Sequence, residues 1–295
     1  MTATIPRQAT LLTRYLAAFC LAACAHGAAA VDYDDGGVNN VDEPLLGGAA
    51  GARVFDGPGG ATTTLNLLDG AVVNGVEVFD GSLVNMFSGA TVSADVNVRD
   101  DGTMNLFGGS LLNADVLDDA RLNVSGGTFT GNGGRAIGTF GNAALTITDV
   151  TLSGNPTFAL LASGNSTIDV IGGAINGEVR ANDDTVVDVL GGSGIDAVTA
   201  TTRGTVTLFG SAFSLGALGP VSLATPFVIG DDTYNGQLLS GVLADGSAIS
   251  AEIFNGVSGS QIVLAAAPIP LPAAAWLLGP ALVGLLGRAR RRRRA

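Results

Sequence analysis

The chain has 295 residues, of which 47% are hydrophobic, and its formal net charge at pH 7 is −12. Its two cysteines and single histidine are Cys20, Cys24 and His26. A mature chain that has lost this N-terminal segment therefore has no disulfide, no Cys/His zinc site and no histidine-dependent catalytic triad.

Residues 1–30 have the features of a secretory signal peptide. Arginines and an apolar stretch precede a small-residue cleavage site formed by Ala28 and Ala30. We expect an N-terminal signal helix here and cleavage before Val31. The Leu-Ala-Ala-Cys sequence that ends at Cys24 also fits a lipobox, which would instead leave a lipid-modified cysteine at the new N-terminus.

Residues 31–267 contain all 26 acidic residues and only six basic ones, all arginine. Their difference gives this body a net charge of −20. Such a charge repels a phosphate backbone, so we expect no nucleic-acid binding, and it keeps an exported protein soluble. The first part, 31–60, is acidic and glycine-rich, and we expect it to be a leader into the segment that follows.

Residues 61–214 repeat one motif eight times, in which an Asn, Asp or Thr stands between two apolar residues. The central residues are Asn66, Asn85, Asn105, Asn123, Thr146, Asp169, Asp188 and Thr207, at steps of 18 to 23 residues. Alternation with period two predicts strands. Coils of this length with glycine corners predict an all-β fold, a parallel β-helix solenoid of about eight coils.

Within each coil, the apolar members of the motif should form interior ladders and the asparagines an outer column. The residue that follows each motif, such as Phe107, either bends inward or forms an exposed stripe. A second apolar position follows the central residue by 10 or 11 residues, at Val76, Val96, Val116, Val179 and Val198. In the two 23-residue coils it follows by 14, so the extra residues should lie between the two strands.

An acidic turn follows the second strand of several coils, as in Asp80, Asp100, Asp101, Asp118, Asp119, Asp183 and Asp184. Stacked coils would bring these carboxylates within about 5 Å of one another, where they repel unless a cation bridges them. A candidate calcium site therefore lies at Asp100, Asp101, Asp118 and Asp119. The other interpretation is a solvated turn with no cofactor.

Parallel β-helices often carry polysaccharide lyases and glycoside hydrolases, so an enzyme is a second hypothesis. Glycoside hydrolysis needs two positioned carboxylates. The six arginines of the body occupy different coil positions, so no basic patch is evident. We therefore expect no catalytic residues, and a carboxylate pair within a groove would favour the enzyme.

The repeat loses its register at Leu215. Residues 215–267 contain a turn and further strand patterns. We expect them to form a β cap that covers the open edge of the last coil.

Residues 268–295 form a tail with three parts. Pro270 and Pro272 keep the first part extended and accessible. The uncharged stretch 271–287 is long enough for a short transmembrane helix, with Trp276 at one interface. The positive-inside rule would hold the basic part, 288–295, at the cytoplasmic face through Arg288, Arg290, Arg291, Arg292, Arg293 and Arg294.

This order of parts resembles the PEP-CTERM sorting domain, in the variant P-L-P-A-A-A-W-L-L-G, which covers only this tail. The matching motif residues are Pro270, Leu271, Pro272, Ala273, Ala274, Ala275 and Trp276. Leu271 departs from the family pattern, which has glutamate there. The resemblance implies processing by an exosortase, a membrane protease, in a Gram-negative bacterium that makes exopolysaccharide. The alternative is a plain C-terminal membrane anchor.

Together these features predict an exported cell-surface or matrix protein with a structural or adhesive role. Its expected partners are the exosortase, transiently, the inner membrane before processing, and extracellular polysaccharide or neighbouring surface proteins. The second hypothesis is a secreted polysaccharide-degrading enzyme, a lyase or glycoside hydrolase.

Overall fold

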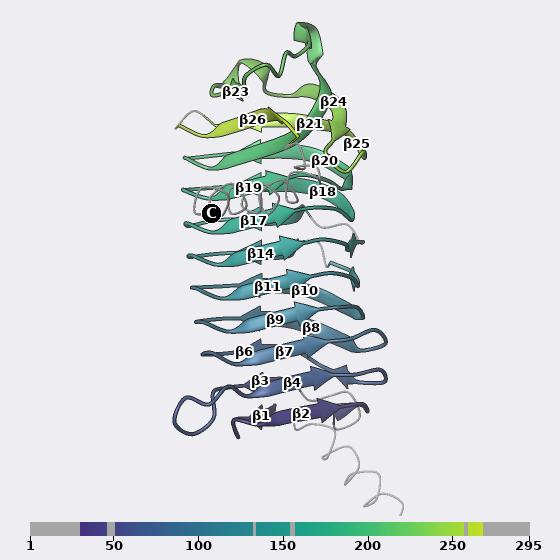
Figure 1. The fold of residues 1–295 in the computed structure, drawn as a ribbon, viewed down its shortest axis with the longest axis vertical. Coiled ribbons are helices and arrows are strands. Elements are labelled where there is room, and N and C mark those ends of the chain that lie inside the picture. The colour runs from purple at the N-terminus through teal and green to yellow at the C-terminus, as the bar shows by residue number, and fades with distance from the viewer. Residues whose placement is uncertain (1–29, 46–50, 132–133, 154–156, 257–258, 268–295) are drawn as a thin grey trace, which may run out of the picture.

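The computed structural model describes residues 30–45, 51–131, 134–153, 157–256 and 259–267. They form an elongated all-β solenoid whose coils stack along one axis (Figure 1). The predicted parallel β-solenoid of about eight coils is thereby confirmed. The predicted signal helix and transmembrane helix lie outside the described residues, within which no helix is long and apolar enough to cross a membrane.

One parallel ladder, here called the first ladder, contains the repeated motif at its centre. Each strand pairs in register with the corresponding strand of the next coil. The strands are β2 (Val38–Val41), β4 (Thr64–Leu67), β7 (Leu83–Met86), β9 (Thr103–Leu106), β11 (Arg121–Val124), β14 (Ala144–Ile147), β17 (Thr167–Val170), β19 (Val186–Val189), β21 (Thr205–Leu215) and β26 (Gln261–Ala266).

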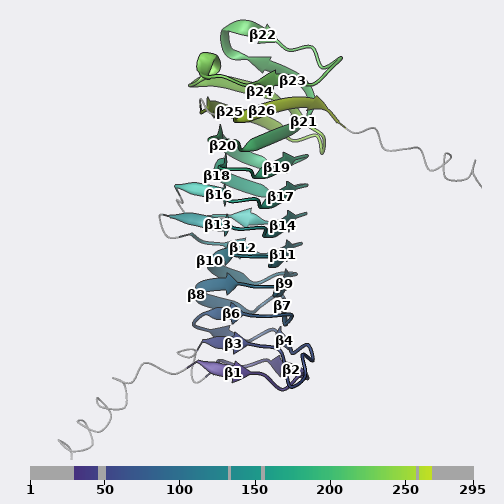
Figure 2. The same ribbon diagram turned by 90° about the vertical axis from the view of Figure 1, so that its left-hand side faces the viewer.

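A second parallel ladder runs along the opposite side of the coils (Figure 2). Its strands are β1 (Val31–Tyr33), β3 (Ala52–Val54), β6 (Val76–Val78), β8 (Thr91–Val98), β10 (Ser110–Val116), β13 (Arg135–Thr139), β16 (Phe158–Ala162), β18 (Ala174–Ala181), β20 (Ser193–Ala200) and β25 (Ala248–Asn255).

A short ladder joins these two. It is formed by β5 (Val72–Val73), β12 (Thr128–Phe129), β15 (Thr151–Leu152) and the first residues of β8, β10, β18 and β20. A glycine corner precedes the short ladder in several coils. A turn, often with aspartate, returns the chain from the second ladder to the next first-ladder strand.

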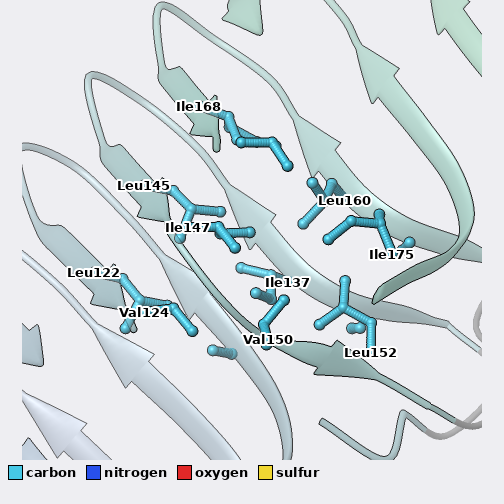
Figure 3. Close-up of a cluster of buried hydrophobic side chains, with 14 of the residues drawn as sticks. Leu122, Val124, Ile137, Leu145, Ile147, Val150, Leu152, Leu160, Ile168 and Ile175 are labelled. Carbon is cyan, nitrogen blue, oxygen red and sulfur yellow. The ribbon is translucent and has the colours of Figure 1, made fainter. Parts of the chain in front are cut away.

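The core fills the space between the ladders with aliphatic side chains stacked coil upon coil (Figure 3). The two apolar members of the motif, such as Leu145 and Ile147, point inward and are fully buried, as predicted. Ile137 and Leu160 from the second ladder pack against them. Each fully buried aliphatic side chain contributes about 1.5–3 kcal/mol, so this continuous column stabilises the solenoid.

The second ladder differs from the predicted spacing in one coil. Val96 pairs with Ala114, whereas Val116 pairs with Val98. The glycine corner before β10 is one residue shorter than the corner before β8, and the pairing shifts by one further residue between Leu111 and Asn113. In the two 23-residue coils, the extra residues lie between the short ladder and the second ladder, as predicted.

The parallel ladders begin within the segment expected to be a leader. β1, β2 and β3 lie in residues 31–54 and pair in parallel with the strands above them. The repeated motif therefore places the predicted start of the solenoid one coil too late.

At the other end, β22 (Gly219–Pro220), β23 (Phe227–Ile229) and β24 (Gln237–Leu243) pair antiparallel with their neighbours. β25 and β26 continue the second and first ladders in parallel. Residues 215–267 thus add one more pair of ladder strands and cover the last coil with antiparallel structure.

Candidate functional surface

The aspartate turns have a conformational cause. The second residue of the turn has a positive φ of 52° to 59° in four coils, at Asp80, Asp100, Asp118 and Asp183. Two other coils have glycine in this place, Gly141 and Gly164. Aspartate and asparagine enter this left-handed region more readily than other residues with a side chain. The recurrence of aspartate is therefore explained by the turn itself.

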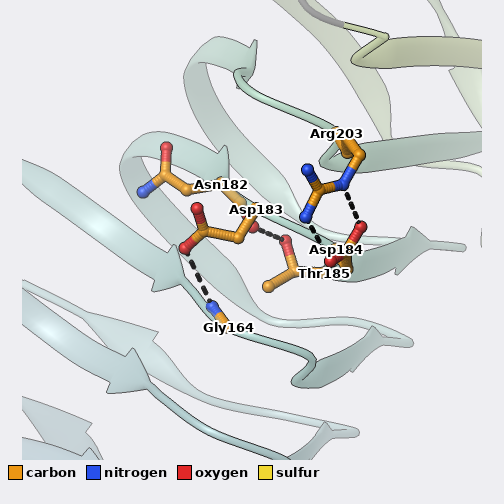
Figure 4. A network of polar contacts seen from close by, with 6 residues as sticks. All are labelled: Gly164, Asn182, Asp183, Asp184, Thr185 and Arg203. Carbon is orange, nitrogen blue, oxygen red and sulfur yellow. Dashed lines mark hydrogen bonds and ion pairs between the residues drawn. The ribbon is translucent and has the colours of Figure 1, made fainter.

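Carboxylates of the turn also bind the coil beside them (Figure 4). Asp183 Oδ2 accepts a hydrogen bond from the Gly164 N–H at 3.1 Å, and Arg203 Nη2 donates to Asp184 Oδ2 at 2.6 Å. The Thr185 hydroxyl donates to the carbonyl of Asn182 at 2.7 Å. The first two contacts fasten neighbouring turns together, and the third lies within one turn.

The candidate calcium site involves the same turns. Asp118 Oδ2 lies 3.5 Å from the N–H of Asp100, and Asp119 Oδ1 accepts a hydrogen bond from Asn142 Nδ2 at 2.9 Å. Among the described residues, no three or more acidic, histidine or cysteine side chains form a group that could hold a metal ion. The turn therefore does not gather Asp100, Asp101, Asp118 and Asp119 into a ligand set.

The predicted outer column of asparagines forms a hydrogen-bonded ladder along the first ladder. Each side-chain Nδ2 donates to the Oδ1 of the asparagine one coil below, at 2.8–2.9 Å. The column contains Asn40, Asn66, Asn85, Asn105 and Asn123, so it begins one coil earlier than predicted. Because these amides bind one another, they have less capacity to bind a ligand.

Farther along the same column, Asp169 and Asp188 lie opposite each other in neighbouring strands. Burial raises the pKa of Asp188, a hydrogen bond with Thr207 opposes this shift, and the charge of Asp169 adds to it. The column thus changes from bonded amides to two carboxylates that repel.

The outer face of the second ladder combines arginines, carboxylates and phenylalanines. Arg53 pairs with Asp32 and Arg135 with Asp115, each across two coils. A cleft of about 370 Å³ lies beside the first pair and is lined in part by Glu77. Asp95, Asn74 and Asn97 also line this cleft. A further cleft of about 340 Å³, lined in part by Arg180 and Phe254, lies next to the cap.

Phe107 and Ile171 are exposed and the other apolar residues after the motif are half-buried, so this position forms a stripe on the outer surface and does not bend inward. Phe107 is 51% exposed, and its ring stacks on that of Phe87 with a centroid separation of 5.3 Å. Beside Phe107 lies a groove of about 510 Å³, here called the corner groove, in the angle between the first and short ladders. Its lining residues are Ser88, Gly89, Ala90, Thr91, Phe107, Gly108, Gly109, Ser110, Gly127 and Thr128, and none carries a charge.

The corner groove presents polar groups without partners. Within the described part of the chain, no hydrogen bond engages the N–H groups of Gly109 and Gly127, or the hydroxyls of Thr91, Ser110 and Thr128. The backbone N–H groups of Thr91, Ser110 and Thr128, by contrast, bond to carbonyls of the coil below. Among the described residues, the N–H groups of Gly109 and Gly127, these three hydroxyls and the Phe107 ring are therefore available to a ligand in the groove.

In a later coil, the equivalent corner is filled by the cap. Gly192 N–H donates to Asp245 Oδ2 at 3.0 Å and lies 3.2 Å from Ser247 Oγ. The same hydroxyl donates to the Gly192 carbonyl at 2.9 Å. Gly109, Gly127 and Gly192 share a positive φ, 91°, 98° and 120° respectively, and each directly precedes a short-ladder strand.

No family model, curated protein or solved structure matched this chain.

The sorting residues 270–276, the arginines 288 and 290–294 and the cleavage residue Ala28 lie outside the described residues, whereas Ala30 is the first described residue and lines the cleft beside Arg53. The sequence pattern predicted the asparagine column and the aspartate turns. It missed the corner groove, although the Phe87 and Phe107 positions and the Gly-Gly pairs that follow the motif mark its walls. It also missed the link from Gly192 to Asp245, which are 53 residues apart.

Proposed function

We propose that this protein is an exported structural or adhesive component of the cell surface or extracellular matrix, released from its membrane anchor by an exosortase and associated with extracellular polysaccharide. The observation that carries this proposal is the order of parts in residues 268–295: a P-x-P entry, an uncharged stretch and an arginine tail. A plain anchor needs neither the prolines nor an arginine-only tail.

The described body suits this role. Ten first-ladder strands at a spacing of about 4.8 Å form a rod roughly 40–50 Å long. A rod of this length can hold a surface at its far end away from the C-terminal tail. The fully buried core is continuous along the rod, and the asparagine ladder spans its first five coils. The strongly acidic surface favours solubility outside the cell.

The test is the intact mass of the protein recovered from the envelope and the medium of its host, with and without the exosortase. We expect loss of the residues beyond about Pro268 only when the protease is present. The variant Pro270→Ala/Pro272→Ala should retain the tail, while Pro280→Ala, outside the entry motif, should be processed normally. An intact arginine tail in the membrane fraction of the wild-type host would contradict the proposal and indicate a plain anchor. A lipid on Cys24 would indicate lipoprotein export instead.

A second candidate is a secreted polysaccharide-degrading enzyme. One observation favours it, the cleft on the second ladder that brings Glu77 and Asp95 beside Arg53. Two carboxylates on one cleft are the minimum that glycoside hydrolysis requires. Release of reducing ends from the host's own polysaccharide, abolished in Glu77→Gln and Asp95→Asn but not in Glu252→Gln, would favour the enzyme over the structural role.

A further inference from the structure

The corner groove and the corner at Gly192 are two copies of one backbone structure. Each has a glycine with positive φ directly before the short ladder, and the strands on both sides continue the same ladders. At Gly192, the N–H meets oxygen atoms of Asp245 and Ser247. At Gly109 and Gly127, the N–H groups have no partner within the described residues.

The contacts at Gly192 show which chemistry the corner accepts. The Ser247 hydroxyl lies 3.2 Å from the glycine N–H, and its single hydrogen faces both the glycine carbonyl at 2.9 Å and Asp245 Oδ1 at 2.6 Å. Only a group that is both donor and acceptor can do this, and a hydroxyl is such a group. A carboxylate can satisfy the N–H alone.

The open corner adds features that the occupied corner lacks. A half-exposed Phe107 ring forms one wall, and the hydroxyls of Thr91, Ser110 and Thr128 repeat at the coil spacing along the other. An apolar ring face beside convergent hydrogen-bonding groups is typical of sites that fix an amphipathic ring.

We propose that the corner groove binds a neutral polysaccharide, with a sugar ring against Phe107 and sugar hydroxyls on the N–H groups of Gly109 and Gly127. This inference rests on the proposed association with extracellular polysaccharide and assigns it a surface. The bound polysaccharide is expected to be neutral for two reasons. No charged side chain lines the groove, and the acidic protein repels a polyanion.

Affinity electrophoresis of the purified protein tests this, in gels that contain hydroxyethylcellulose, galactomannan or, as the anionic comparison, polygalacturonate. We expect at least one neutral polymer to retard the protein. Phe107→Ala should weaken that interaction about tenfold, the loss expected when one aromatic contact is removed. Phe107→Trp should retain it.

The matched control is Ile171→Ala, which removes an exposed apolar side chain from the same stripe, outside the groove. Urea unfolding of each variant separates lost binding from lost fold. Absence of retardation by both neutral polymers, or retardation equal in wild type and Phe107→Ala, would overturn the inference. So would a self-association in sedimentation that depends on Phe107, because the groove would then join two copies of the chain. Correct processing of the tail together with any of these results would leave the proposed function intact.

Discussion

The column of bonded asparagines and the corner groove lie on the same coils, a few residues apart. Within the described residues, the polar groups of the column are hydrogen-bonded, whereas those that the groove offers to a ligand are not. The side-chain amides of Asn66, Asn85 and Asn105 form hydrogen bonds with one another. Gly109 and Gly127 present N–H groups that bond to nothing within the described residues. A regular polar face on a solenoid is thus not by itself a binding face, and unengaged groups are a better guide.

The largest effect on stability is expected when a side chain is added to a glycine of the corner groove. In Gly109→Ala, the new Cβ would lie 2.6 Å from the Ala90 carbonyl oxygen and 2.7 Å from Met86 Cε, at a φ of +91°. We expect the free energy of unfolding to fall by about 3 kcal/mol. Urea titration measures it, with Gly230→Ala as control because nothing lies within 4 Å of its Cβ position. Equal stability of the two variants would show that the corner can relax.

The next largest loss of stability is expected when the Gly192 corner loses the side chain that occupies it. Asp245→Ala removes the hydrogen bonds from Gly192 and Ser247, and we expect a loss of about 2 kcal/mol at neutral pH. Burial works to raise the pKa of Asp245, but the bonds from Ser247 and Gly192 outweigh it, so the pKa is lowered.

A lowered pKa in the folded state means that this contribution is present at neutral pH and lost as the pH falls through the lowered pKa. The difference in stability between wild type and Asp245→Ala should therefore shrink on acidification. The exposed Asp232→Ala is the control. A difference that is constant with pH would contradict the role of the ionised carboxylate.

Breaking the asparagine ladder should cost less. Asn105→Ala removes one bond donated to Asn85 and one accepted from Asn123. We expect a loss of about 1–2 kcal/mol and no change in retardation by neutral polysaccharide. Thr146→Ala is the control, because its hydroxyl in the same column makes no hydrogen bond within the described residues. A loss of polysaccharide binding in Asn105→Ala alone would place the ligand on the wrong face for the inference above.

The smallest effect, and one of opposite sign, is expected from removing a charge in the upper column. Asp188→Asn should raise the free energy of unfolding by about 0.5 kcal/mol at neutral pH, because it ends the repulsion from Asp169. The raised pKa of Asp188 means that the wild type gains stability as the pH falls through that pKa, and the variant should not. Asp196→Asn, an exposed change, is the control. Destabilisation by Asp188→Asn would show that the hydrogen bond with Thr207 outweighs the repulsion from Asp169.

Local alternation was enough to predict the first ladder, because each motif places two aliphatic residues inside and one polar residue outside. The same rule misplaced Val116, since a shortened corner and a register shift in β8 and β10 leave no mark in hydropathy. The coil of β1 to β3 was missed because its segment is rich in glycine and its one motif-like stretch, Val38–Val41, stands 26 residues before the next.

The functional surfaces were harder to predict than the fold. The corner groove depends on which N–H groups remain unbonded, and the Gly192 corner on a residue 53 positions away. Neither is a property of local sequence. The aspartate turns were visible in the sequence, but their positive φ, and hence their structural cause, was not.

The most direct test of the difference between the two surfaces is an NMR titration of the isotope-labelled protein with a soluble neutral polysaccharide. We expect shifts of the amide signals of Gly109 and Gly127 and of the Phe107 ring, with the side-chain amide signals of Asn66, Asn85 and Asn105 unchanged. Shifts of the asparagine side chains with a silent corner groove would contradict it.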